Sequence, residues 1–156
     1  MTRRPRPQLG VMRWIVLSMY FCGVVVYPTV GALVKPPSHP DPDLMPFLPF
    51  LPKVLLAAAL VVYVGSLWVE KEMLHRARRR RAPLEASYTA LVVSALGEAI
   101  SVFGLVLTFA GIPGWSPIFY GLCLAHGVHL ALRWSSYQEI ASGTGNESQE
   151  SPAEEV

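Results

Sequence analysis

Four apolar stretches divide the chain, and each is about as long as a helix needs to be to cross the hydrocarbon of a bilayer. They cover residues 14–34, 53–69, 87–111 and 116–134. Lipid offers no partners to backbone polar groups, and no stretch alternates with the period of barrel strands, so helices are predicted throughout. The pattern predicts an all-α fold, a polytopic membrane four-helix bundle over residues 1–134. A disordered, acidic tail is predicted over residues 135–156.

The positive charges predict how these helices are oriented. Four arginines precede the first stretch and a basic run separates the second from the third, whereas the two opposite loops hold only Lys35 and Lys53. Because short loops rich in Lys and Arg stay cytoplasmic, both termini are expected inside, in a multi-pass protein of the inner (cytoplasmic) membrane. Among 156 residues 52% are hydrophobic and 15% charged, which argues against an ordinary soluble domain.

The loop between the second and third stretches carries a basic cluster. The second helix is expected to extend past Glu70 before this cluster, and Pro83 followed by Glu85 predicts the start of the third helix. Each arginine near a membrane surface attracts anionic lipid by about 1 kcal/mol, so lipid headgroup contact is predicted. Nucleic-acid binding is disfavoured because no aromatic residues interleave the cluster. The arginines are Arg76, Arg78, Arg79, Arg80 and Arg81.

The first stretch and the proline-rich loop that follows it each have a second interpretation. Arginines before an apolar run are typical of a signal peptide, but no small-residue cleavage site follows and Pro28 interrupts the run. Residues 35–52 hold seven prolines, which predicts a stiff connector or, alternatively, a docking strip for a partner. Cys22 and Cys123 lie in predicted spans, where a free thiol is mostly a packing residue, so no disulfide is expected.

One acidic residue, Glu98, interrupts the third stretch about 16 Å from its cytoplasmic end by helical rise, near the bilayer centre. An ionised carboxylate there costs at least about 2.5 kcal/mol, so Glu98 is expected to be protonated, paired or both. Small residues on one side of this helix predict that it packs closely inside the bundle. They are Ala90, Ser94, Gly97, Ser101, Gly104 and Thr108.

The fourth stretch supplies possible partners for Glu98. Counted from the cytoplasmic face, His126 lies nearly level with Glu98 and His129 lies closer to the surface, so a Glu98–His126 hydrogen bond is geometrically allowed. One interpretation is an intramembrane proton or ion binding site formed by Glu98, His126 and His129. The other is a neutral glutamate whose hydrogen bonds hold the helices together. No second ligand cluster accompanies the histidines, so neither a metal nor a cofactor is predicted.

Residues 95–107 carry a resemblance to a known family. Their sequence, ALGEAISVFGLVL, resembles the ion-carrying helix of the proteolipid (c) subunits of rotary ATPases, in which a carboxylate precedes a small residue and an aromatic-Gly-Leu-Val run. The resemblance implies that Glu98 binds a proton or a sodium ion. The second stretch lacks the repeated glycines of that family, and the fourth has no counterpart in a two-helix proteolipid. The whole chain is more similar to small uncharacterised bacterial four-span membrane proteins whose third helix is proteolipid-like.

No signature of a soluble enzyme appears: there is no nucleotide-binding glycine loop, nucleophile elbow or zinc-protease motif. The sequence therefore predicts a non-enzymatic integral membrane protein, a subunit or accessory of a membrane assembly with a buried structural or proton-binding glutamate. The alternative is a proteolipid-like component that translocates protons or cations through Glu98. A third, weaker hypothesis is an anchor that places histidines for haem or quinone. Expected partners are the bilayer, anionic lipids, and another membrane protein or a second copy of the chain, but not nucleic acid.

Overall fold

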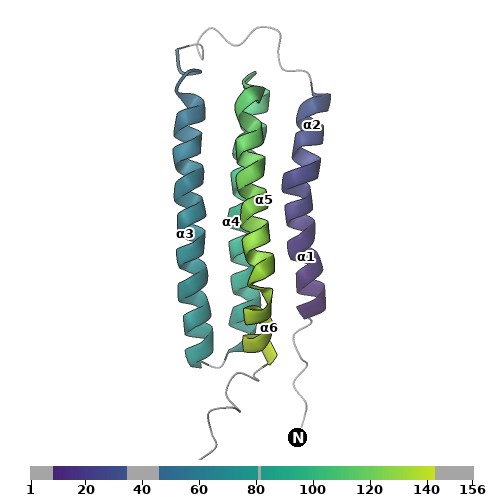
Figure 1. The fold of residues 1–156 in the computed structure, drawn as a ribbon, viewed down its shortest axis with the longest axis vertical. Helices are drawn as coiled ribbons and strands as arrows, with labels where there is room; N and C mark the ends of the chain where they lie inside the picture. Colours follow the sequence, from purple (N-terminus) through teal and green to yellow (C-terminus); the bar gives the residue numbers. More distant parts are fainter. Residues whose placement is uncertain (1–8, 35–45, 81, 143–156) are drawn as a thin grey trace, which may run out of the picture.

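The computed structural model describes residues 9–34, 46–80 and 82–142, which form long helices lying side by side (Figure 1). No strand occurs in these ranges, so the predicted all-helical class is confirmed. In chain order the elements are α1 (Leu9–Phe21), the π-helical segment η1 (Cys22–Val26), α2 (Tyr27–Leu33), α3 (Leu51–Arg80), α4 (Pro83–Phe109), the 3₁₀ turn η2 (Pro113–Trp115), α5 (Ser116–Leu132) and α6 (Trp134–Ser142).

Three segments of the described chain are long and apolar enough to cross a membrane: Val11–Leu33, Leu51–Arg80 and Leu84–Phe109. Their outward sides expose large apolar residues such as Trp14, Val61 and Trp68, as expected where lipid is the solvent. These three segments coincide with the first three predicted spans. The fourth predicted span corresponds to α5, whose 17 residues extend only about 25 Å by helical rise, so it stays a prediction.

The first span is one continuous rod made of α1, η1 and α2 (Figure 1). Pro28 lies within it, although proline removes a backbone donor and crowds the carbonyl four residues earlier. The five-residue π segment directly before α2 accommodates this, because the Tyr27 N–H bonds to the Cys22 carbonyl instead of continuing the α pattern. Pro28 therefore changes the hydrogen-bond pattern without ending the helix.

The connection between the second and third helices follows the prediction. α3 runs through the expected extension to Arg80, and α4 begins with Pro83 in its first turn and Glu85 close behind. The guanidinium of Arg80 lies 3.6 Å from the Glu85 carboxylate, across the connection. Arg81 and the arginines at positions 3, 4 and 6 lie outside the described residues, as does the proline-rich loop over 35–45.

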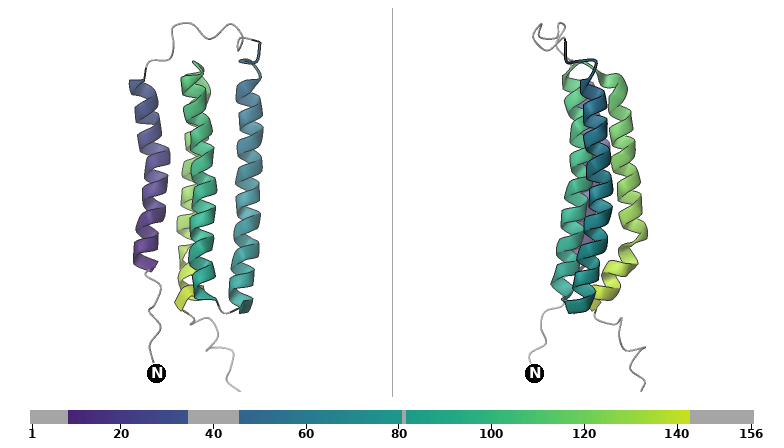
Figure 2. Two further views of the ribbon diagram at one scale, coloured as in Figure 1. Left: turned by 180° about the vertical axis from the view of Figure 1, so that it is seen from behind. Right: turned by 90° about the vertical axis from the view of Figure 1, so that its left-hand side faces the viewer.

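Helix α4 is the centre of the bundle, since it contacts α1, α2, α3, α5 and α6. Figure 2 shows it between α3 and the α1–α2 rod from behind. The predicted small-residue side of this helix is buried, including Ala90, Ser94 and Ser101, which confirms that it packs closely. Near the end of α4 and the start of α5, the Ser116 hydroxyl donates a hydrogen bond of 2.8 Å to the Gly104 carbonyl. This bond joins α4 and α5 as a hairpin.

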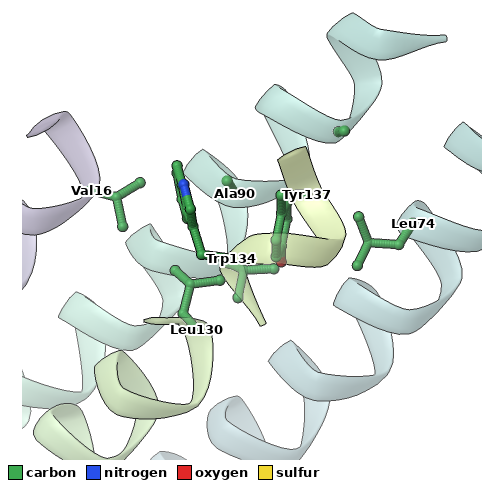
Figure 3. Close-up of a cluster of buried hydrophobic side chains, with 8 residues drawn as sticks. Val16, Leu74, Ala90, Leu130, Trp134 and Tyr137 are labelled. Carbon is green, nitrogen blue, oxygen red and sulfur yellow. The ribbon is translucent and has the colours of Figure 1, made fainter. Parts of the chain in front are cut away.

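A disordered tail was predicted from residue 135. This prediction was wrong for residues 135–142, which form α6 together with Trp134. Trp134, Tyr137 and Ala141 recur at helical spacing and are all buried, so this segment has one apolar face. That face packs against Leu74 of α3 and Leu130 of α5 in the cluster of Figure 3. The ribbon views place α6 at the same end of the bundle as the start of α1. Residues 143–156 lie outside the described part.

Candidate functional site

His126 is fully buried in α5 and is hydrogen-bonded through both ring nitrogens. Nδ1 lies 2.5 Å from the Tyr20 hydroxyl of α1, and Nε2 lies 2.6 Å from the Ser66 hydroxyl of α3. The Ser66 hydroxyl also lies 2.7 Å from the Tyr63 carbonyl. These contacts are satisfied together if Tyr20 donates to Nδ1, Nε2–H donates to Ser66, and Ser66 donates to the carbonyl. One imidazole ring thus joins three helices.

Two glycines make room for this arrangement. A Cβ atom on Gly97 of α4 would lie 2.6 Å from both His126 Nδ1 and the Tyr20 hydroxyl. A Cβ atom on Gly127 of α5 would lie 2.9 Å from the Tyr20 ring. Neither distance is a tolerable carbon contact, so Tyr20 and His126 reach each other only because both backbones lack a side chain at these points.

A second ionisable group, Glu70 of α3, is fully buried nearer the α6 end of the bundle. Its Oε2 lies 3.0 Å from His129 Nε2, and its Oε1 lies 3.6 Å from the Arg133 guanidinium. The side chains of His129 and Arg133 are 32% and 42% exposed, so they connect a buried acid to the protein surface. Glu70 therefore has two partners, His129 of α5 and Arg133, the residue that follows α5.

Tyr137 of α6 lies close to this acidic group. Burial raises the pKa of Tyr137 above its ordinary value, and the nearby Glu70 carboxylate raises it further, so the hydroxyl stays protonated at neutral pH. Within the described residues neither the Tyr137 hydroxyl nor Glu70 Oε1 has a hydrogen-bond partner of good geometry. Helix α6 thus brings a buried hydroxyl close to Glu70.

Glu98 lies elsewhere in the bundle and is half-buried. Its Oε1 accepts a hydrogen bond of 2.9 Å from the Tyr27 hydroxyl of α2. Because both nitrogens of His126 already have other partners, the Glu98–His126 pairing that the helical spacing allowed is not the one formed. The three predicted site residues therefore have different hydrogen-bond partners: Glu98 bonds to Tyr27, His126 to two hydroxyls, and His129 to Glu70.

The predicted lipid-contacting arginines lie at one end of the bundle, near the α3–α4 connection. Arg76 pairs with Glu72 at 2.8 Å, and Arg78 lies 3.9 Å from Glu139 of α6. These groups are well exposed, so the pairs add little to stability and leave the arginines available to other anions. Arg79 is also exposed.

The described residues contain no group of three or more His, Cys, Asp or Glu side chains that could hold a metal ion. Cys22 and Cys123 are free thiols. The chain matches no known family model, no curated protein and no solved structure. The resemblance of α4 to proteolipid subunits therefore stays a prediction.

Proposed function

We propose that this is a four-span membrane protein with both termini in the cytoplasm. The arrangement of helices supports α5 as the fourth span, because it lies alongside α4 and is joined to it by the short η2 turn. Its ends are extended by η2 on one side and α6 on the other, which offsets its short length. The basic cluster at the α3–α4 connection supports the orientation, because such clusters remain cytoplasmic.

Within that topology we propose a non-enzymatic role as a subunit or accessory of a membrane assembly. The observation that carries this proposal is the His126 contact set, in which one imidazole is hydrogen-bonded to Tyr20 and Ser66 from two other helices. A side chain enclosed in this way has no free nitrogen to offer a substrate, a metal or a haem. It is suited instead to holding α1, α3 and α5 in one register. The Glu70 cluster joins α3, α5 and α6 in the same manner.

The size of the particle extracted from native membranes tests this role. In a mild detergent the protein is expected in a particle whose protein mass exceeds that of one 17.1 kDa chain. Light scattering with detergent correction measures that mass, and chemical cross-linking before extraction is the control for dissociation. A single chain in both measurements would contradict the proposal.

A second candidate function is proton or cation translocation through Glu98, which the resemblance of α4 implies. Its support is that Glu98 contacts one neutral hydroxyl, from Tyr27, and forms no ion pair with a described residue. A carboxyl group at that depth without a cation beside it is an unusual placement and is often functional. Glu70 differs because it has Arg133 and His129 as partners.

Substituting Glu98 by glutamine tests this second candidate. If translocation is correct, Glu98→Gln keeps the fold but abolishes proton flux in proteoliposomes. In the wild type, a hydrophobic carbodiimide is then expected to modify Glu98 more slowly as the pH rises. Tyr27→Phe is the companion variant, because it removes the hydrogen bond to Glu98 and keeps the carboxyl. Unchanged flux in Glu98→Gln, or no flux in the wild type, would reject translocation.

A further inference from the structure

A groove lies between α1 and α5 at the end of the bundle where α6 begins. It exists because α1 packs chiefly against α4 and touches α5 at few positions. Gly127 contributes no side chain to its α5 wall. The enclosed volume is about 80 Å³, several times the roughly 10 to 15 Å³ that one water molecule needs. The groove can therefore hold part of a larger molecule.

The walls of the groove are apolar, but its rim carries a positive charge. Val16, Leu17 and Leu130 form much of the walls, and Arg13 stands at the rim. Arg13 is exposed and has no ion-pair partner among the described residues, unlike Arg76, Arg78 and Arg80. This combination suits a ligand with an anionic head and an apolar chain.

Trp134 adds a second polar feature to the groove. It is 9% exposed and lines the groove, and its indole Nε1 is enclosed without a hydrogen-bond acceptor in the described part of the chain. Figure 3 shows the ring between Val16 and the other members of the buried cluster. Buried indole N–H groups usually have an acceptor, and tryptophan is enriched at the level of lipid headgroups. The indole N–H of Trp134 therefore lacks an acceptor, and it does so beside an apolar groove at the expected depth of the membrane interface.

We propose that this groove binds one anionic phospholipid, with its phosphate beside Arg13 and the upper part of an acyl chain along Val16, Leu17 and Leu130. The charge of Arg13 selects an acidic headgroup over a zwitterionic one, because the two share the same acyl chemistry and differ in net charge. The site is separate from the basic cluster of the α3–α4 connection. It depends on the chain lying in a bilayer and not on the proposed roles of His126 or Glu98.

Native mass spectrometry of the purified full chain tests the site with phosphatidylglycerol and phosphatidylcholine of identical acyl chains. The wild type is expected to retain one phosphatidylglycerol with about fivefold preference, the factor that corresponds to about 1 kcal/mol for one arginine. Arg13→Gln is expected to reduce the preference to about one. Lys53→Gln is the matched control, since it also removes one exposed positive charge but lies outside the groove and outside the basic cluster, and it should keep the preference.

A second pair of variants tests the apolar part of the site. Ala131 is exposed and lines the groove, so Ala131→Phe is expected to fill it and to lower lipid retention about fivefold while helicity stays unchanged. Val128→Phe, at an exposed position of α5 that does not line the groove, should retain lipid like the wild type. Equal retention of the two lipids by the wild type, no effect of Arg13→Gln, or an equal loss in Lys53→Gln would overturn the proposal.

Discussion

His126→Ala is expected to lower the free energy of unfolding by about 3 kcal/mol. Most of this comes from the cavity left by a fully buried ring, for which large-to-small substitutions cost about 2 kcal/mol or more. The hydroxyls of Tyr20 and Ser66 also lose their common partner. Interhelical hydrogen bonds in membranes average only about 0.6 kcal/mol each, so these two losses add about 1 kcal/mol.

The unfolding free energy can be measured by adding a denaturing detergent to protein in mild micelles and following its helicity. His75→Ala provides the control, because His75 is exposed near the end of α3, and a change of less than about 0.5 kcal/mol is expected there. An equal, small effect of both substitutions would show that His126 does not hold the bundle together. Ser66→Ala should show a smaller effect than His126→Ala, since it removes one hydrogen bond and little volume.

Gly97→Ala is expected to destabilise the bundle by about 2 to 3 kcal/mol, although it adds a single methyl group. The new Cβ would lie 2.6 Å from His126 Nδ1 and the Tyr20 hydroxyl, two atoms already held by their mutual hydrogen bond. Either that hydrogen bond breaks or α4 moves away from α1 and α5, and overpacking of this kind costs about 1 to 3 kcal/mol. Loss of the hydrogen bond adds to that cost.

Gly65→Ala is the matched control for Gly97→Ala, measured in the same unfolding titration. A Cβ on Gly65 meets nothing within 4 Å, and alanine favours helix over glycine by about 0.5 to 1 kcal/mol. The two substitutions should therefore have opposite signs. A neutral or stabilising effect of Gly97→Ala would mean that Tyr20 and His126 do not meet against α4 as described.

The helices themselves could be predicted from the sequence because an apolar run in lipid has few alternatives to a helix. Pro83 and Glu85 marked the start of α4 by local chemistry, and the small residues of α4 indicated its packed side. Glu98 was conspicuous as a single acid in an apolar stretch. Its partner was not predictable, because helix spacing gives depth but does not tell which neighbouring helix faces a given side chain.

Glu70 was missed because it opens the charged run Glu70, Lys71 and Glu72, which looks like the solvated continuation of a span. The available signal was its register: Ala59, Ser66 and Glu70 follow one side of α3. Helix α6 was missed because serine, glutamate and glutamine dominate its composition. The signal there was the helical spacing of Trp134, Tyr137 and Ala141. These three residues form one buried face, although the composition of the helix as a whole is polar.

The short turn between α4 and α5 has a consequence for how the protein enters the membrane during biogenesis. From residue 99 to residue 132 the chain contains no Asp, Glu, Lys or Arg. If α5 is the fourth span, as proposed, this hairpin can pass through the insertion machinery without moving a formal charge to the far side. In the proposed topology the earlier hairpin must carry Lys35, Asp41, Asp43 and Lys53 across. Translocating charged groups is costly, so the two halves of the chain place unequal demands on that machinery.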